Sequence, residues 1–164
     1  MRRVGAALAV IIVTVALVAC QNGGQPGVAI NGWIWPTTAP LPEGATAVKL
    51  DVASIPGGVR PDIEYGACPT ALLLPVTIHH VPDDAASPIH YRSVQDGQEV
   101  HVRWQVGFSA RLNPDLEIVA PDGTVIAREG VPVDGLGGGG IGPGDAFSVC
   151  LPQYGPTRVG APAD

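Results

Sequence analysis

The sequence predicts an all-β domain, and three observations carry the prediction. Apolar and polar residues alternate with a period of two in several short stretches, as in strands with one buried face. Glycine and proline, 22 and 17 of 164 residues, provide many turns. No segment after residue 20 has the apolar spacing of a helix. We therefore expect one small β-sandwich or partly open β-barrel, an OB-like fold included, over residues 28–151.

The first predicted strand carries two tryptophans. Trp33-Ile34-Trp35 stands between Asn31-Gly32 and a proline-rich segment that ends at Pro42. Residues two apart in a strand share a face, so both indoles point the same way. We expect them to pack against the domain, because large aromatic side chains dominate core energetics. The alternative is an exposed aromatic platform for a glycan or peptide.

Three further stretches alternate as half-buried strands do. In residues 48–52 the apolar positions are Val48, Leu50 and Val52, and residues 74–80 follow the same pattern. The longest alternation covers residues 99–106. Its apolar positions are Val100, Val102, Trp104 and Val106, and its polar positions are Glu99, His101, Arg103 and Gln105. A slip by one residue would exchange the two faces, so the register should be well specified.

The last third of the chain predicts a hairpin and a final strand. Residues 116–120 and 124–128 flank Pro121-Asp122-Gly123, a sequence typical of a hairpin turn. Residues 146–151 alternate as a strand with Phe147 and Val149 on one side. We expect residues 152–164 to form a loose C-terminal tail.

The first 20 residues have the pattern of an export signal. A basic start, Met1-Arg2-Arg3, precedes an uncharged apolar run over residues 4–18 and the sequence Leu17-Val18-Ala19-Cys20. This ending resembles the lipobox of bacterial lipoproteins. The apolar run is shorter than the ~20 residues that cross a bilayer as a helix. The resemblance implies that residues 1–19 are a signal peptide and that Cys20 becomes the lipidated N-terminus, with residues 20–27 as a flexible tether.

Lipidation would place the domain at a membrane surface outside the cytoplasm. Two or more acyl chains, palmitate among them, anchor a protein stably, whereas one chain does so only marginally. The resemblance leaves two locations open, the outer face of the cytoplasmic membrane and the outer membrane. Residues 107–112, together with the hairpin and Phe147-Ser148-Val149-Cys150, also resemble small secreted β-rich lipoproteins, which implies export but no activity.

The charge balance limits the partners. Two of the nine basic residues lie in the signal peptide, which leaves seven against 15 acidic residues and a formal charge of −8. Nucleic-acid binding needs basic residues to neutralise phosphates, so we expect no nucleic-acid partner. The expected partners are the membrane, through the lipid anchor, and a protein, glycan or small ligand.

The cysteine count predicts one disulfide bond. The chain has three cysteines, and lipidation of Cys20 would leave Cys68 and Cys150. Oxidising compartments outside the cytoplasm let disulfides persist, so we expect these two to be bonded. The alternative is a pair of reduced, buried cysteines that act as small apolar residues.

No catalytic, metal or cofactor site is predicted from motifs. The sequence lacks Gly-x-Ser-x-Gly and Ser-x-x-Lys. Residues 135–140 match Gly-x-Gly-x-x-Gly, but the residues that follow cannot begin the helix of a dinucleotide site, and we expect a mobile connection. The favoured function is a non-catalytic extracytoplasmic binding or interaction module. The alternative is a hydrolase or metal-dependent enzyme with a site around His79 or His80, Asp83 and Asp84.

The lipobox predicts that fatty acid is attached at Cys20. Cells that produce the protein should incorporate an alkyne fatty acid into the wild-type chain, and Cys20→Ser should abolish that label. Cys150→Ser is the matched control, because it removes a cysteine outside the lipobox. Undiminished label in the Cys20→Ser chain would contradict the prediction.

Overall fold

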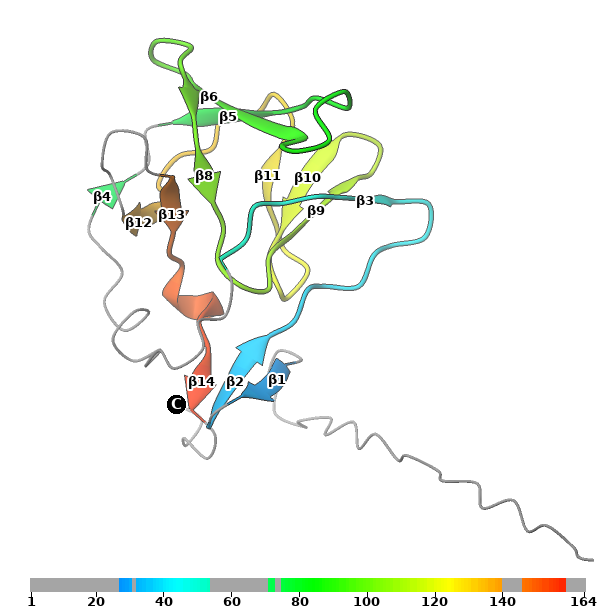
Figure 1. The fold of residues 1–164 in the computed structure, drawn as a ribbon, viewed down its shortest axis with the longest axis vertical. Helices are drawn as coiled ribbons and strands as arrows, with labels where there is room; N and C mark the ends of the chain where they lie inside the picture. The colour runs from blue at the N-terminus through cyan, green and yellow to red at the C-terminus, as the bar shows by residue number, and fades with distance from the viewer. Residues whose placement is uncertain (1–26, 31, 54–70, 73–74, 140–145, 159–164) are drawn as a thin grey trace, which may run out of the picture.

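The protein has an all-β fold in a computed structural model that describes residues 27–30, 32–53, 71–72, 75–139 and 146–158 (Figure 1). The predicted signal peptide, most of the predicted tether, Cys20 and Cys68 lie outside these residues. Within the described ranges, no helix is long and apolar enough to cross a membrane.

The described strands form four small sheets. The first is β1 (Gly27–Ile30), β2 (Trp33–Pro36) and β14 (Thr157–Arg158), in the order β1-β2-β14. The second, in the order β11-β10-β9-β3, contains β11 (Val125–Arg128), β10 (Leu116–Val119), β9 (Ser109–Leu112) and β3 (Thr46–Val48). The third, in the order β4-β12-β13-β8, contains β4 (Ala71–Leu72), β12 (Gly137–Gly139), β13 (Phe147–Val149) and β8 (Val102–Arg103). The fourth is β5 (Val76–His80), β6 (Ile89–Ser93) and β7 (Glu99–Val100).

One hydrophobic core joins three of these sheets. Its buried side chains come from β5 and β6, from β8 and β13, and from β9, β10 and β11. Trp104, which follows β8, is only 1% exposed, and its ring centroid lies 5.2 Å from that of Phe108. None of the described sheets closes into a barrel. The all-β prediction is therefore confirmed, in the form of a small β-sandwich.

The predicted strand over residues 99–106 is divided between two sheets. Glu99–Val100 (β7) pairs with β6, whereas Val102–Arg103 (β8) pairs in parallel with β13. The alternation of burial continues through Trp104 and then ends, because Gln105 is 2% exposed. Its predicted place on the polar face is wrong. The Gln105 side chain lies inside the fold, where its Oε1 accepts a hydrogen bond of 3.0 Å from the backbone N–H of Leu151.

The glycine run is a strand, so the predicted mobile connection is wrong for residues 137–139. Strand β12 pairs with β13 through Gly138 and Gly139. A Cβ atom on Gly138 would lie 2.2 Å from the carbonyl oxygen of Ser148 and 2.5 Å from the Phe147 ring. Glycine is needed here because the neighbouring strand leaves no room for a side chain.

The predicted loose tail is wrong for residues 152–158. A 3₁₀ helix (η1, Pro152–Tyr154) follows β13, and β14 then pairs with β2. The Tyr154 ring packs edge-on against Phe108, with centroids 5.4 Å apart. This aromatic contact, beyond the predicted boundary at residue 151, holds the C-terminal segment against the core.

The two tryptophans of β2 pack against the domain, as predicted. Trp35 is buried and Trp33 is half-buried. Strand β2 lies between β1 and β14, so it is the central strand of its sheet and not an edge strand.

The predicted hairpin is confirmed, and two carboxylates stabilise it. Strands β10 and β11 are antiparallel, with Glu117 opposite Arg128. Glu117 is 3% exposed and forms ion pairs with Arg111 on β9 and with Arg128. Glu129 accepts hydrogen bonds from the backbone N–H groups of His80 (2.9 Å) and Leu116 (3.2 Å). The His80 bond contributes most to holding the pKa of Glu129 below its usual range, and the carboxylate ties β5 to the hairpin.

The position of Trp104 predicts a large loss of stability on truncation. Trp104→Ala should lower the free energy of unfolding by about 3–5 kcal/mol, because it removes a buried large aromatic side chain and leaves a cavity. Urea unfolding measures the change. Gln98→Ala, at an exposed position, should change stability by less than about 0.5 kcal/mol. An equally small effect of Trp104→Ala would contradict the packing described.

Candidate functional site

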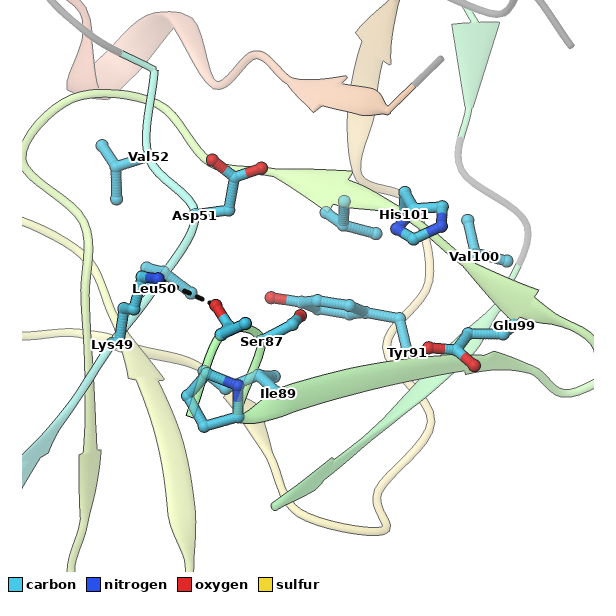
Figure 2. Close-up of a pocket in the computed structure, with 13 residues that line it drawn as sticks. Lys49, Leu50, Asp51, Val52, Ser87, Ile89, Tyr91, Glu99, Val100 and His101 are labelled. Carbon is cyan, nitrogen blue, oxygen red and sulfur yellow. Dashed lines mark hydrogen bonds between the residues drawn. The ribbon is translucent and has the colours of Figure 1, made fainter. Parts of the chain in front are cut away.

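A polar groove lies between three segments that are distant in sequence (Figure 2). Its lining comes from residues 49–52, residues 86–89 with Tyr91 on β6, and residues 99–102. Its volume is about 350 Å³. We call this feature the polar groove.

The first wall is the chain between β3 and the core. The backbone N–H of Trp104 donates to the carbonyl oxygen of Asp51 at 2.8 Å, and the N–H of Ala53 donates to the carbonyl of Trp104 at 2.8 Å. Because the segment is extended, Leu50 and Val52 are partly buried while Lys49 and Asp51 are exposed. The sequence predicted this alternation correctly.

The second wall is the loop that precedes β6. Asp84 Oδ1 accepts hydrogen bonds from the N–H groups of Ala86 (3.1 Å) and Ser87 (3.0 Å), which folds the loop into a tight turn. Lys49 Nζ donates to the carbonyl oxygen of Ala86 at 2.8 Å across the groove. These contacts fix the two walls relative to each other.

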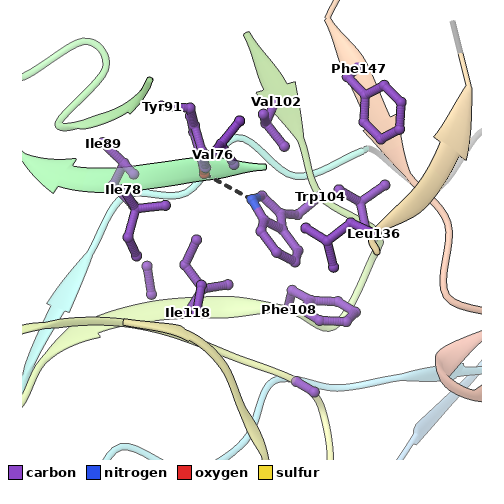
Figure 3. Packing of buried hydrophobic residues seen from close by; sticks show 14 of the residues in the cluster. Val76, Ile78, Ile89, Tyr91, Val102, Trp104, Phe108, Ile118, Leu136 and Phe147 are labelled. Carbon is purple, nitrogen blue, oxygen red and sulfur yellow. Dashed lines mark hydrogen bonds between the residues drawn. The ribbon is translucent and has the colours of Figure 1, made fainter. Parts of the chain in front are cut away.

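Tyr91 lies between the groove and the core (Figures 2 and 3). It is 6% exposed, and its hydroxyl oxygen accepts a hydrogen bond of 2.8 Å from Trp104 Nε1. Burial raises the pKa of Tyr91 far above its ordinary value, and the charge of Asp51 adds to this, so the phenol stays neutral. An indole N–H can only donate, which leaves the Tyr91 hydroxyl hydrogen free to donate in turn. None of the described residues accepts it.

A histidine between two carboxylates stands beside the groove. His90 Nε2 lies 3.2 Å from Asp84 Oδ2, and His90 Nδ1 lies 3.0 Å from Glu99 Oε1. Hydrogen bonds from the Ser87 N–H and then from His90 hold the pKa of Asp84 below its usual range. Both ring nitrogens face carboxylates, so His90 positions Glu99 at the groove rather than presenting a free nitrogen to a nucleophile.

Three residues of the alternative enzyme site, His79, His80 and Asp84, contact other partners in the structure. His79 Nε2 pairs with Thr77 Oγ1 at 2.9 Å, and the His80 backbone binds Glu129. Asp84 contacts His90 instead of His79 or His80. Within the described ranges, no group of three or more His, Cys, Asp or Glu side chains could hold a metal ion.

The cysteine predictions fall largely outside the described residues. Cys150 is buried. Cys20 and Cys68 are not among the described residues. The pairing of Cys150 with Cys68 therefore stays a prediction.

Sequence reasoning did not find the polar groove. The sequence pattern places four of the lining residues only at polar positions of alternating strands: Lys49, Asp51, Glu99 and His101. No sequence pattern singles out Tyr91. The groove depends on three segments meeting in space, which no local motif records. No family model, no curated protein and no solved structure matches the chain.

The bond between Trp104 and Tyr91 predicts a measurable coupling. Tyr91→Phe should cost about 1–3 kcal/mol of stability, because it leaves the buried Trp104 N–H without an acceptor. Trp104→Phe removes the donor, so adding Tyr91→Phe to that variant should cost clearly less. Urea unfolding of the wild type, both single variants and the double variant measures the coupling. Strict additivity would contradict the bond.

Proposed function

We propose that the chain is a lipid-anchored, extracytoplasmic binding module that holds a small polar ligand in the polar groove without transforming it. One observation carries the binding role: the groove collects Lys49, Asp51, Tyr91, Glu99 and His101 from separate segments around one space. Small-ligand sites are commonly concave, with a few convergent polar groups that fix the orientation of the ligand.

The site is preorganised, which favours binding. Backbone pairing with Trp104 holds Asp51, and the contact with His90 holds Glu99. The bond from Trp104 orients the Tyr91 hydroxyl. A ligand therefore meets groups that are already in place, and little conformational entropy is lost on binding.

The leader and the cysteines support export and anchoring. The basic start, apolar run and lipobox ending at Cys20 form the pattern of a lipoprotein signal peptide. A disulfide at Cys150 would suit an oxidising compartment, and Cys68 is its proposed partner because Cys20 would carry lipid. In this proposal the tether presents the groove to ligands outside the cytoplasm, on the cytoplasmic membrane or the outer membrane.

Binding in the groove can be tested without knowing the ligand. The purified mature protein is screened by thermal shift against small sugars, amines, organic acids, phosphate esters and short peptides. A ligand that binds should raise the unfolding temperature and protect residues 84–103 from hydrogen exchange.

A groove-filling substitution provides the specificity control. Ser87→Trp places a large ring at the groove and should abolish the thermal shift, whereas Ala85→Trp, in the same loop but outside the lining, should preserve it. A ligand that binds Ser87→Trp as well as wild type, or no binding from any class, would contradict the proposed function.

A further inference from the structure

We infer that His90 makes the polar groove sensitive to pH: the charged imidazole holds Glu99 at the groove, and the neutral imidazole releases it. This inference rests on the proposed function and concerns the regulation of the same site. Glu99 is one of the residues that line the groove (Figure 2). The position of its carboxylate therefore decides whether the groove presents this negative charge to a ligand.

The geometry around His90 fits the charged form of the ring. Nε2 lies 3.2 Å from Asp84 Oδ2, and Nδ1 lies 3.0 Å from Glu99 Oε1. An ionised carboxylate can only accept hydrogen bonds, so each ring nitrogen must carry a hydrogen. Neutral imidazole has one N–H and one lone pair, whereas imidazolium has two N–H groups. The two contacts therefore form together only while His90 is charged.

Asp84 keeps its contact when His90 loses a proton. Its Oδ1 accepts hydrogen bonds from the N–H groups of Ala86 and Ser87, which fix the carboxylate in the loop. Hydrogen bonds from the Ser87 N–H and then from His90 hold the pKa of Asp84 below its usual range, so this group stays ionised wherever histidine titrates. The single hydrogen of neutral His90 then stays on Nε2, toward Asp84, and the lone pair of Nδ1 faces Glu99.

Glu99 is the carboxylate that can move. Its side chain is 54% exposed, against 37% for that of Asp84, and His90 is the only described residue that pairs with its carboxylate. A lone pair opposite an ionised oxygen is repulsive, so the contact with neutral His90 is lost.

Arg92 provides a second partner for the released carboxylate. It lies directly opposite Glu99 on the neighbouring strand, is exposed, and forms no ion pair with any described residue. Residues opposite each other in a sheet share a face, so the guanidinium is within reach of Glu99.

Two more titratable groups lie near His90. His79 is directly opposite it on β5, and the Nε2 atom of His79 pairs with Thr77 Oγ1. Lys49 contacts the loop at the carbonyl oxygen of Ala86. Neither group bonds to His90, so within the described residues only the two carboxylates accept hydrogens from its ring.

The direction of the switch follows from the charge of the ring. Histidine ordinarily changes its charge between about pH 5 and 8. The contact between His90 and Glu99 is therefore present at the acidic end of this range and is lost as the pH rises. The groove presents the Glu99 carboxylate in acid, and Arg92 takes that carboxylate at higher pH.

Carbon-13 and nitrogen-15 NMR of the mature protein tests the inference from about pH 5 to about pH 9, which spans the ordinary titration of histidine. The carboxyl carbon of Glu99 should show a step that coincides with the titration of the His90 ring, and neutral His90 should carry its hydrogen on Nε2. His90→Gln should abolish the step. His101→Gln should preserve it, because His101 is exposed and lines the groove but contacts neither carboxylate. A step that persists in His90→Gln, or no step in the wild type, would overturn the inference.

Double-mutant cycles show whether Glu99 changes its partner. Glu99→Gln is combined with His90→Gln and, separately, with Arg92→Gln, and urea unfolding is measured at both ends of the pH range. The coupling with His90 should change the unfolding equilibrium constant about two- to fivefold in acid and disappear at high pH, as suits a partly exposed ion pair. The coupling with Arg92 should show the opposite pH dependence. Couplings that do not change with pH would contradict the exchange of partners.

The inference and the proposed function can fail separately. The spectra and the cycles need no ligand, so they decide whether His90 controls Glu99 whatever the thermal-shift screen finds. A screen in which no compound binds would contradict the proposed function alone. A Glu99 carboxylate that stays in place across the pH range would overturn the inference and leave binding in the groove intact.

Discussion

The hydrogen bond between Trp104 and Tyr91 connects the packing of the domain to its candidate site. Trp104 fills the centre of the core, pairs through its backbone with the segment that carries Asp51, and contacts Phe108, which in turn packs against Tyr154. Its indole N–H must be satisfied because it is buried. Tyr91 satisfies it through its hydroxyl oxygen, whose hydrogen stays available to another acceptor. The orientation of the hydroxyl at the groove thus follows from a requirement of the core.

One buried carboxylate links strands within a sheet, and one half-buried carboxylate links two sheets. Charged residues are 15% of the sequence, yet Glu117 lies 3% exposed between two arginines. Removing both arginines would leave the Glu117 carboxylate buried without a partner, which destabilises a fold. Glu129 has a related role, since its carboxylate accepts backbone hydrogens from β5 and from β10. These acidic residues are structural, whereas Asp51 and Glu99 are exposed and available to a ligand.

The rear and the walls of the polar groove are both held in place by contacts within the fold. Tyr91 and the segment at Asp51 are fixed by core contacts, while the loop at Ala86 is fixed by the carboxylate of Asp84 and the amine of Lys49. A site of this kind binds by offering placed hydrogen-bonding groups. The leader predicts that the protein is tethered outside the cytoplasm. Polar compounds would reach the groove there without electrostatic attraction by the protein.

The sequence by itself determined the fold class, the hairpin and the buried face around Val102 and Trp104, because these depend on local periodicity and turn chemistry. The export signal is also inferred from the sequence alone, and it stays a prediction. Only the tertiary structure decided that residues 99–106 divide between two sheets, that Gly138 lies in a strand, and that Tyr154 packs on the core. Each depends on a partner distant in sequence. The polar groove has the same origin, since Asp51, Tyr91 and Glu99 meet only after the sheets have packed.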